Sequence, residues 1–202
     1  TTTQNMKLVF TPHSYDSLGS FGGYHYLYDS VYGGAKSVVQ MPLDGSTAAQ
    51  TVVTGIDRAL GVTGNYLVYQ QKPATGGVEI YSLDLSNPAL PARLIKTLAS
   101  VEDVSTAAGR VYYTAFNRSG STVLSVQAAS MKADGSDQVV FDGGVWVGID
   151  HRNGNQAAFP TLASEHLYLA QAVSFSASGA WTGGNLSWVD TNTGRIGAAI
   201  GG

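Results

Sequence analysis

Residues 64–69 (GNYLVY) place a turn before alternating apolar and aromatic side chains, and this pattern decides the fold prediction. It recurs at residues 109–113 (GRVYY) and 165–169 (EHLYL), with a weaker copy at 5–10 (NMKLVF). A turn followed by alternation is typical of a β-strand that leaves a hairpin. The recurrence therefore indicates an all-β chain built from internal repeats.

Three other short segments accompany each copy in a constant order. A strand with an Asp, Asn or Gly turn follows it, another strand leaves that turn, and a small apolar strand precedes the next copy. The strands that end in turns are residues 38–46 (VVQMPLDGS), 78–87 (VEIYSLDLSN), 126–136 (VQAASMKADGS) and 186–194 (LSWVDTNTG). The small apolar strands are residues 59–62, 104–107 and 157–159. Four short strands per repeat of roughly 40 to 60 residues predict β-propeller blades, because radial stacking buries both faces of each twisted sheet.

We therefore predict one all-β, β-propeller-like domain over residues 1–202, with about four four-stranded blades at approximately 5–55, 56–98, 99–143 and 144–202. The first repeat lacks an innermost strand and the last ends on its outermost strand. This favours a fragment of a larger propeller, or one of two chains that form a ring; a compact four-bladed ring is the alternative. The chain begins at Thr1 rather than at Met, so we expect a removed leader or a piece of a longer protein.

Two of the turns carry a family resemblance. Residues 38–46 (VVQMPLDGS) resemble the blade turn of TolB-like and YWTD-like propellers, and residues 186–194 (LSWVDTNTG) resemble the turn of quinoprotein-like and YVTN-type repeats. The resemblance implies the propeller fold and no particular activity, because this fold hosts many unrelated functions. Motifs for the metal site of quinoprotein dehydrogenases are absent from the sequence.

Composition excludes several classes of protein. The net charge is −3 and no basic run occurs, which argues against nucleic acid as a partner. No apolar stretch approaches the roughly 18 residues that a transmembrane helix needs. Cysteine is absent and lysine is scarce, while Ser, Thr, Gly and Tyr are abundant, and this composition favours an exported protein, whether periplasmic, cell-surface or secreted.

The most unusual segment is residues 13–34 (HSYDSLGSFGGYHYLYDSVYGG), which is rich in tyrosine. We expect it to be a loop inserted between the second and third strands of the first repeat, where its aromatic side chains would contact a ligand. The alternative is a hairpin whose alternating tyrosines pack on a neighbouring blade. The candidate binding residues are Tyr15, Tyr24, His25, Tyr26, Tyr28 and Tyr32, together with Trp181 from a second loop.

The sequence predicts no cofactor and no metal site. Two turns rich in Asp and Asn offer oxygen ligands for calcium, at Asp150 with Asn153 and at Asp190 with Asn192. Neither turn has the closing acidic residue of a calcium loop, so ordinary turn chemistry is the simpler interpretation, with calcium as the alternative. No G-x-S-x-G or phosphate-binding glycine motif occurs.

These observations predict a non-enzymatic binding or scaffold domain of an exported protein, which recognises a protein, peptide or glycan through loops on one rim. Further blades from a longer chain or a second subunit would be additional partners. The first alternative is a propeller-type enzyme, a hydrolase, lyase or oxidoreductase, with its site at the channel mouth. The second is a purely structural domain.

Overall fold

The computed structural model describes residues 13–31, 34–100, 103–120, 122–142, 145–147, 166–175, 181–190, 193 and 195–199. These residues form four antiparallel sheets, each with four strands in simple up-and-down order. No helix in the described residues has the length and hydropathy needed to cross a membrane.

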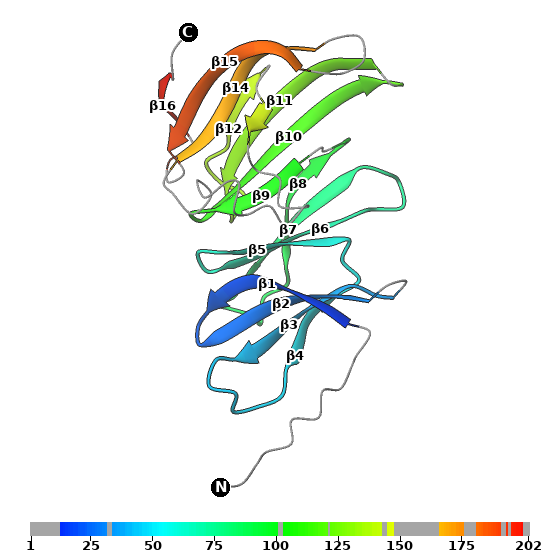
Figure 1. Ribbon diagram of the computed structural model, residues 1–202. Helices are drawn as coiled ribbons and strands as arrows, with labels where there is room; N and C mark the ends of the chain where they lie inside the picture. Colours follow the sequence, from blue (N-terminus) through cyan, green and yellow to red (C-terminus); the bar gives the residue numbers. More distant parts are fainter. Residues whose placement is uncertain are drawn as a thin grey trace, which may run out of the picture.

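The strands follow the chain from sheet to sheet. Sheet 1 contains β1 (His13–Phe21), β2 (Tyr24–Val31), β3 (Ser37–Pro42) and β4 (Gln50–Thr54), and sheet 2 contains β5 (Arg58–Thr63), β6 (Tyr66–Gln71), β7 (Val78–Asp84) and β8 (Arg93–Leu98). Sheet 3 contains β9 (Asp103–Ala107), β10 (Arg110–Ser119), β11 (Thr122–Lys132) and β12 (Val139–Asp142), and sheet 4 contains β13 (Val145–Val147), β14 (His166–Phe175), β15 (Trp181–Asp190) and β16 (Arg195–Ala199). Figure 1 shows the sheets stacked in chain order, from sheet 1 at the bottom to sheet 4 at the top.

Two-residue turns join the first and second strands of sheets 1 to 3. Gly22 and Gly23 connect β1 to β2, and both have positive φ, at 59° and 84°. Ala108 and Gly109 do the same between β9 and β10, with φ of 47° and 75°. Positive φ at both positions matches the twist of a tight hairpin, which is why these turns contain glycine.

A second recurrent turn joins the third and fourth strands. Oδ1 of Asp44, Asp84 and Asp134 accepts a bond from the backbone nitrogen of the serine two residues later, at 2.9, 2.9 and 2.8 Å. The hydroxyl group of the same serine and, after it, this backbone bond hold the pKa of each of the three carboxyl groups below its usual value. The Asp-x-Ser turn is therefore a repeated structural device.

The core lies between the sheets. Leu67 and Tyr69 on β6 pack toward sheet 1, while Val68 between them packs toward sheet 3. Both faces of this strand are therefore covered, which explains its continuous apolar run. Each such buried side chain contributes roughly 1.5–3 kcal/mol of hydrophobic stabilisation.

The innermost strands β1, β5 and β9 lie next to one another and approach closely. β5 contains a bulge at Leu60 and Gly61, and Gly61 has φ of 148°. A Cβ at this glycine would lie 2.7 Å from Thr106 Oγ1 on β9, so only glycine fits. The bulge thus sets the spacing between sheets 2 and 3 at their inner edge.

Three predictions about the repeats were wrong. The first repeat does not lack an innermost strand, because β1 takes that place in sheet 1. Residues 13–31 do not form an inserted loop, because they are the two innermost strands, β1 and β2, of sheet 1. The innermost strand of the fourth repeat is β13, rather than residues 157–159, which lie outside the described residues. The apolar alternation of the tyrosine segment was a strand signal, as the hairpin alternative supposed. Residues 5–10, the weaker first copy of the pattern, also lie outside the described residues.

Candidate functional site

The predicted tyrosines divide between the two faces of sheet 1. Tyr26 and Tyr28 on β2 face sheet 2, and Tyr26 is 3% exposed within the core. Burial raises the pKa of Tyr26 above its ordinary value. Tyr24, two residues earlier on the same strand face, is 37% exposed. Tyr26 is thus a packing residue, and Tyr28 stands at the edge of a cavity described below.

Tyr15 and His25 lie on the other face of sheet 1. Tyr15 on β1 is 50% exposed and pairs across the sheet with Asp29. The His25 ring nitrogens lie near two serine hydroxyl groups: Nδ1 is 2.8 Å from Ser20 Oγ and Nε2 is 3.2 Å from Ser17 Oγ. Tyr32 lies outside the described residues, and Trp181 begins β15 with a side chain that is likewise outside them. Among the predicted residues whose side chains the structure describes, Tyr15 and His25 therefore lie on one face of sheet 1, and the three tyrosines of β2 lie on the other.

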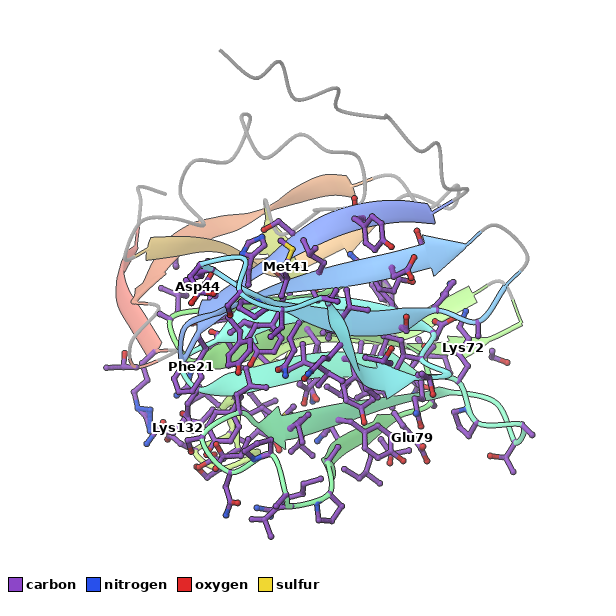
Figure 2. All side chains as sticks on the ribbon, turned by 90° about the horizontal axis from the view of Figure 1, so that it is seen from below. Phe21, Met41, Asp44, Lys72, Glu79 and Lys132 are labelled. Atoms are coloured by element: carbon purple, nitrogen blue, oxygen red, sulfur yellow. The ribbon has the colours of Figure 1, made fainter. Side chains whose placement is uncertain are left out.

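A recess with charged walls lies along the innermost strands. A cavity of about 930 Å³ is lined by residues from β1, β5 and β9 and by Lys36, Asp57 and Lys72 from the connections between strands. These connections, β2–β3, β4–β5 and β6–β7, all lie at the same end of the up-and-down sheets. Figure 2 shows Lys72 at one end of the sheets, with Phe21, Asp44 and Lys132 at the other.

Asp57 is the centre of the polar contacts in this cavity. Its backbone oxygen accepts bonds from Lys36 Nζ at 2.7 Å and from the Tyr28 hydroxyl at 3.2 Å. Its carboxylate lies 3.9 Å from Lys36 Nζ and 3.6 Å from Lys72 Nζ, and accepts a bond from Gln70 Nε2 at 3.3 Å. Backbone bonds also hold the segment, because Gly55 N donates to Lys36 O and Asp57 N donates to Gln70 O. Sheets 1 and 2 together therefore position Asp57.

Arg58 differs from its neighbours. It begins β5, is half-buried and lines the cavity, yet it makes no ion pair with any of the residues that the structure describes. Its positive charge lowers the pKa of Tyr28, but burial and the charges of Asp57 and Asp16 outweigh it, so that this pKa is raised. The Tyr28 phenol is consequently neutral near pH 7.

Known proteins share the architecture rather than the sequence. No family model and no curated protein matches the chain. The β-propeller domain of the Trilobed protease from Pyrococcus furiosus matches it with a TM-score of 0.57 at 9% identity, over 94% of this chain and 57% of that one. The acylaminoacyl peptidase of Pyrococcus horikoshii matches it with a TM-score of 0.56 at 8% identity, over 95% of this chain and 33% of that one. A second acylaminoacyl peptidase structure, in complex with Z-Gly-Gly-Phe-chloromethyl ketone, matches with a TM-score of 0.57 at 7% identity, over 94% of this chain and 32% of that one.

The chain has a β-propeller fold. This confirms the predicted fold class, and the described residues contain four of its sheets. The chain spans 57% of the first of these solved chains and about a third of the other two. Sheets of a propeller surround a central channel, with their innermost strands nearest to it. We therefore call the cavity along the innermost strands β1, β5 and β9 the channel mouth.

Sequence reasoning missed the channel-mouth residues. Asp57 precedes the innermost strand β5 and Arg58 is its first residue, whereas the predicted site rested on tyrosine content. The available signal was topological: a charged pair directly before the apolar segment 59–62.

The described residues contain no group of three or more metal-ligating side chains. Asp150, Asn153 and Asn192 lie outside them, and Asp190 ends β15 with a side chain outside them. The calcium alternative at these turns therefore stays a prediction.

Proposed function

We propose that this propeller is a non-enzymatic binding domain that holds a carboxylate of a peptide or protein partner at its channel mouth. The single observation that supports this is Arg58, a half-buried guanidinium in the cavity without an ion-pair partner among the described side chains. A guanidinium presents a planar fork of donors that matches a carboxylate in two parallel bonds. Asp57 does not fill this role, because Lys36, Lys72 and Gln70 already surround its carboxylate.

The surroundings of Arg58 also support binding. The cavity carries three cationic side chains, Lys36, Arg58 and Lys72, against the two carboxylates of Asp16 and Asp57. The Tyr28 phenol beside them adds no negative charge that would oppose a carboxylate, because its raised pKa keeps the proton on the oxygen. A volume of about 930 Å³ lies within the range of small-ligand sites, roughly 300–1,000 Å³.

Binding is a better interpretation than acid–base catalysis for this cavity. A general acid or base works best when its pKa lies near the working pH. The pKa shift of Tyr28 is upward, away from neutrality. Among the described lining residues, no histidine is present to supply a group that titrates near pH 7.

The proposal is tested by titrating the protein with N-acetylglutamate and with its neutral analogue N-acetylglutamine, followed by amide NMR shifts. We expect N-acetylglutamate to perturb residues around Arg58, and Arg58→Gln to weaken its binding by about tenfold, the loss typical of a charged hydrogen bond. Because Arg58 is half-buried, salt should weaken binding only partly.

The matched control is Arg93→Gln, which removes an exposed arginine from the other end of sheet 2 and should leave the titration unchanged. Equal binding of the acid and its amide would contradict the proposal. Glucuronate bound in preference to N-acetylglutamate would instead assign the site to an acidic glycan. Export of the protein and contacts with further blades, which the sequence predicts, stay predictions.

A further inference from the structure

A second cavity, of about 390 Å³, lies between sheets 2 and 3 at the end opposite to the channel mouth. Sheet 2 forms most of its wall, and Asp134 from the β11–β12 turn of sheet 3 closes one side. Gly135 in that turn approaches Ile95 on β8 so closely that a Cβ would lie 3.0 Å from Ile95 Cγ2. The two sheets therefore meet beside the cavity without filling it.

Ser82 on β7 lines this cavity and is 4% exposed. Its Oγ has no hydrogen-bond partner in the part of the chain that the structure describes. A buried hydroxyl without a partner is unfavourable, so such groups are usually paired with protein, water or ligand. In sheet 3, the serine at the equivalent register, Ser130, accepts a bond from Arg110 Nη2 at 3.1 Å. The unpaired hydroxyl is thus specific to the cavity.

Two carboxylates flank Ser82 with acceptor atoms to spare. The side chains of Asn65 and Ser86 and the Ser86 backbone all donate to Oδ1 of Asp84. The backbone and hydroxyl of Ser136 likewise donate to Oδ1 of Asp134. Oδ2 of each carboxylate takes none of these bonds, and both residues line the cavity.

The rest of the wall is apolar apart from one cation. Leu90 is 54% exposed, and Pro91 beside it and the half-buried ring of Tyr66 extend the apolar surface. Arg93 lines the cavity as well, and its positive charge lowers the pKa of Asp134. The cavity therefore combines an apolar wall, two carboxylates, one guanidinium and one unpaired hydroxyl.

This combination favours a neutral ligand rich in hydroxyl groups. The two carboxylates disfavour an anion, and Arg93 disfavours a cation near Asp134. A sugar ring presents an apolar C–H face for Leu90 and Tyr66, and hydroxyl groups that both donate to carboxylates and accept from a guanidinium or serine. We propose that this cavity is a subsite for one neutral hexose unit of a glycan, bound between sheets 2 and 3 and separate from the channel mouth.

The test uses methyl α-D-glucopyranoside, methyl β-D-galactopyranoside, methyl α-D-mannopyranoside and N-acetylglucosamine as probes, followed by amide NMR shifts of the full chain. We expect at least one of them to bind in the millimolar range and to shift the amides of residues 90, 93 and 134. Ser82→Ala should weaken this binding about fivefold, and Asp134→Asn about tenfold, because each removes one hydrogen bond. Ser130→Ala, the same change at the equivalent register of sheet 3, should leave sugar affinity unchanged.

Three outcomes would overturn the proposal. The first is that none of the four sugars shifts these amides. The second is that a sugar binds but neither Ser82→Ala nor Asp134→Asn weakens its binding. The third is that N-acetylarginine amide occupies the cavity in preference to every sugar, which would make the cavity a site for a basic peptide side chain. Ser82→Ala removes a hydroxyl without a partner, so we expect the variant to fold, and an unchanged melting temperature would show that weaker binding is not a loss of structure. Arg58→Gln, at the channel mouth, should not affect the sugar titration, which separates this proposal from the preceding one.

Discussion

Tyr66 on β6 and Arg110 on β10 hold the same place in consecutive sheets. Each is the first residue after a two-residue turn, and each is paired across the sheet with the last residue of the third strand, Asp84 or Lys132. Arg110 is 1% exposed and bonds to Ser130, to Asp137 O at 2.7 Å and to the Asp137 carboxylate at 2.8 Å. Tyr66 reaches none of the corresponding groups, and a cavity stands in their place. The residue at this place therefore decides whether a side chain fills the space between two neighbouring sheets or leaves a cavity. We call the space between sheets 3 and 4 at Arg110 the filled junction, and the space between sheets 2 and 3 at Tyr66 the open junction.

The filled junction also joins sheet 3 to sheet 4. Asp137 lies before β12, and its second carboxylate oxygen is 3.4 Å from Arg195 Nη2 on β16. Two arginines from different sheets thus share one carboxylate in the filled junction. At the equivalent place, the open junction has an apolar wall and a serine hydroxyl without a partner among the described residues. The comparison teaches that a propeller can vary what fills the space between neighbouring sheets without altering its strands.

Removal of the arginine should have the largest effect. Arg110→Met keeps most of the side-chain volume but removes the hydrogen bonds that Arg110 donates to Ser130 and to Asp137 O. We expect the free energy of unfolding to fall by about 3 kcal/mol, because buried polar groups that lose a partner are costly. Urea unfolding followed by tryptophan fluorescence measures it. A loss below about 0.5 kcal/mol would show that the filled junction is not held by this network.

The next effect concerns the turn that separates the two junctions. Gly135→Ala introduces a side chain at φ of 84° and presses it against Ile95. Gly45, in the equivalent Asp-x-Ser turn of sheet 1, has φ of 66° and open space around it. Positive φ alone costs roughly 1 kcal/mol for alanine, so Gly45→Ala should lose about that much and Gly135→Ala about 2 kcal/mol. Equal losses would mean that the contact with Ile95 yields without cost.

The fold was more predictable from the sequence than the junctions were. In strand segments such as 66–69 and 78–84, the alternating residues and the adjacent turn residues are close together in the sequence. The order in which these segments recur therefore predicts the position of each strand in a blade. Sheet 1 was misjudged because its first hairpin is dense in tyrosine, which has high strand propensity but also suits binding loops. Arg110 and Ser82 lie in ordinary strand positions, and only the pairing between strands and the stacking of sheets determines what each side chain meets.

The channel mouth was hidden from the sequence for a related reason. Lys36, Asp57 and Lys72 come from three different connections, and neither their spacing nor their residue types mark them as a group. They meet because up-and-down strands return these connections to the same end of the sheets. A site assembled by topology from single residues has no local signature.

A second pair of variants compares the two serines directly, without ligand. Ser130→Ala removes an acceptor from Arg110 and should cost about 1 kcal/mol of stability. Ser82→Ala removes a buried hydroxyl that has no partner among the described residues, so stability should be unchanged or rise slightly. Thermal unfolding of both variants measures the difference. A comparable loss for Ser82→Ala would show that its hydroxyl already has a partner and that the open junction is less open than its geometry indicates.

The smallest effect is the pH dependence of the filled junction. The hydrogen bond from Arg110, and then the charges of Arg110 and Arg195, hold the pKa of Asp137 below its usual value against desolvation. Because the pKa is lower in the folded state than in the unfolded chain, the unfolded chain binds the proton first as pH falls, and stability decreases in that direction. The contribution of Asp137 to stability is fully present above its unfolded pKa of about 4 and disappears as pH drops through the lower folded pKa.

Asp137→Asn should therefore flatten the decrease in urea midpoint between pH 5 and pH 2.5. Asp44→Asn, in the equivalent turn of sheet 1, should leave the part of this decrease that is due to Asp137 intact. If Asp137→Asn and the parent protein lose stability in parallel over this range, Arg110 holds the junction by its hydrogen bonds to Asp137 O and Ser130 rather than through the charge on Asp137.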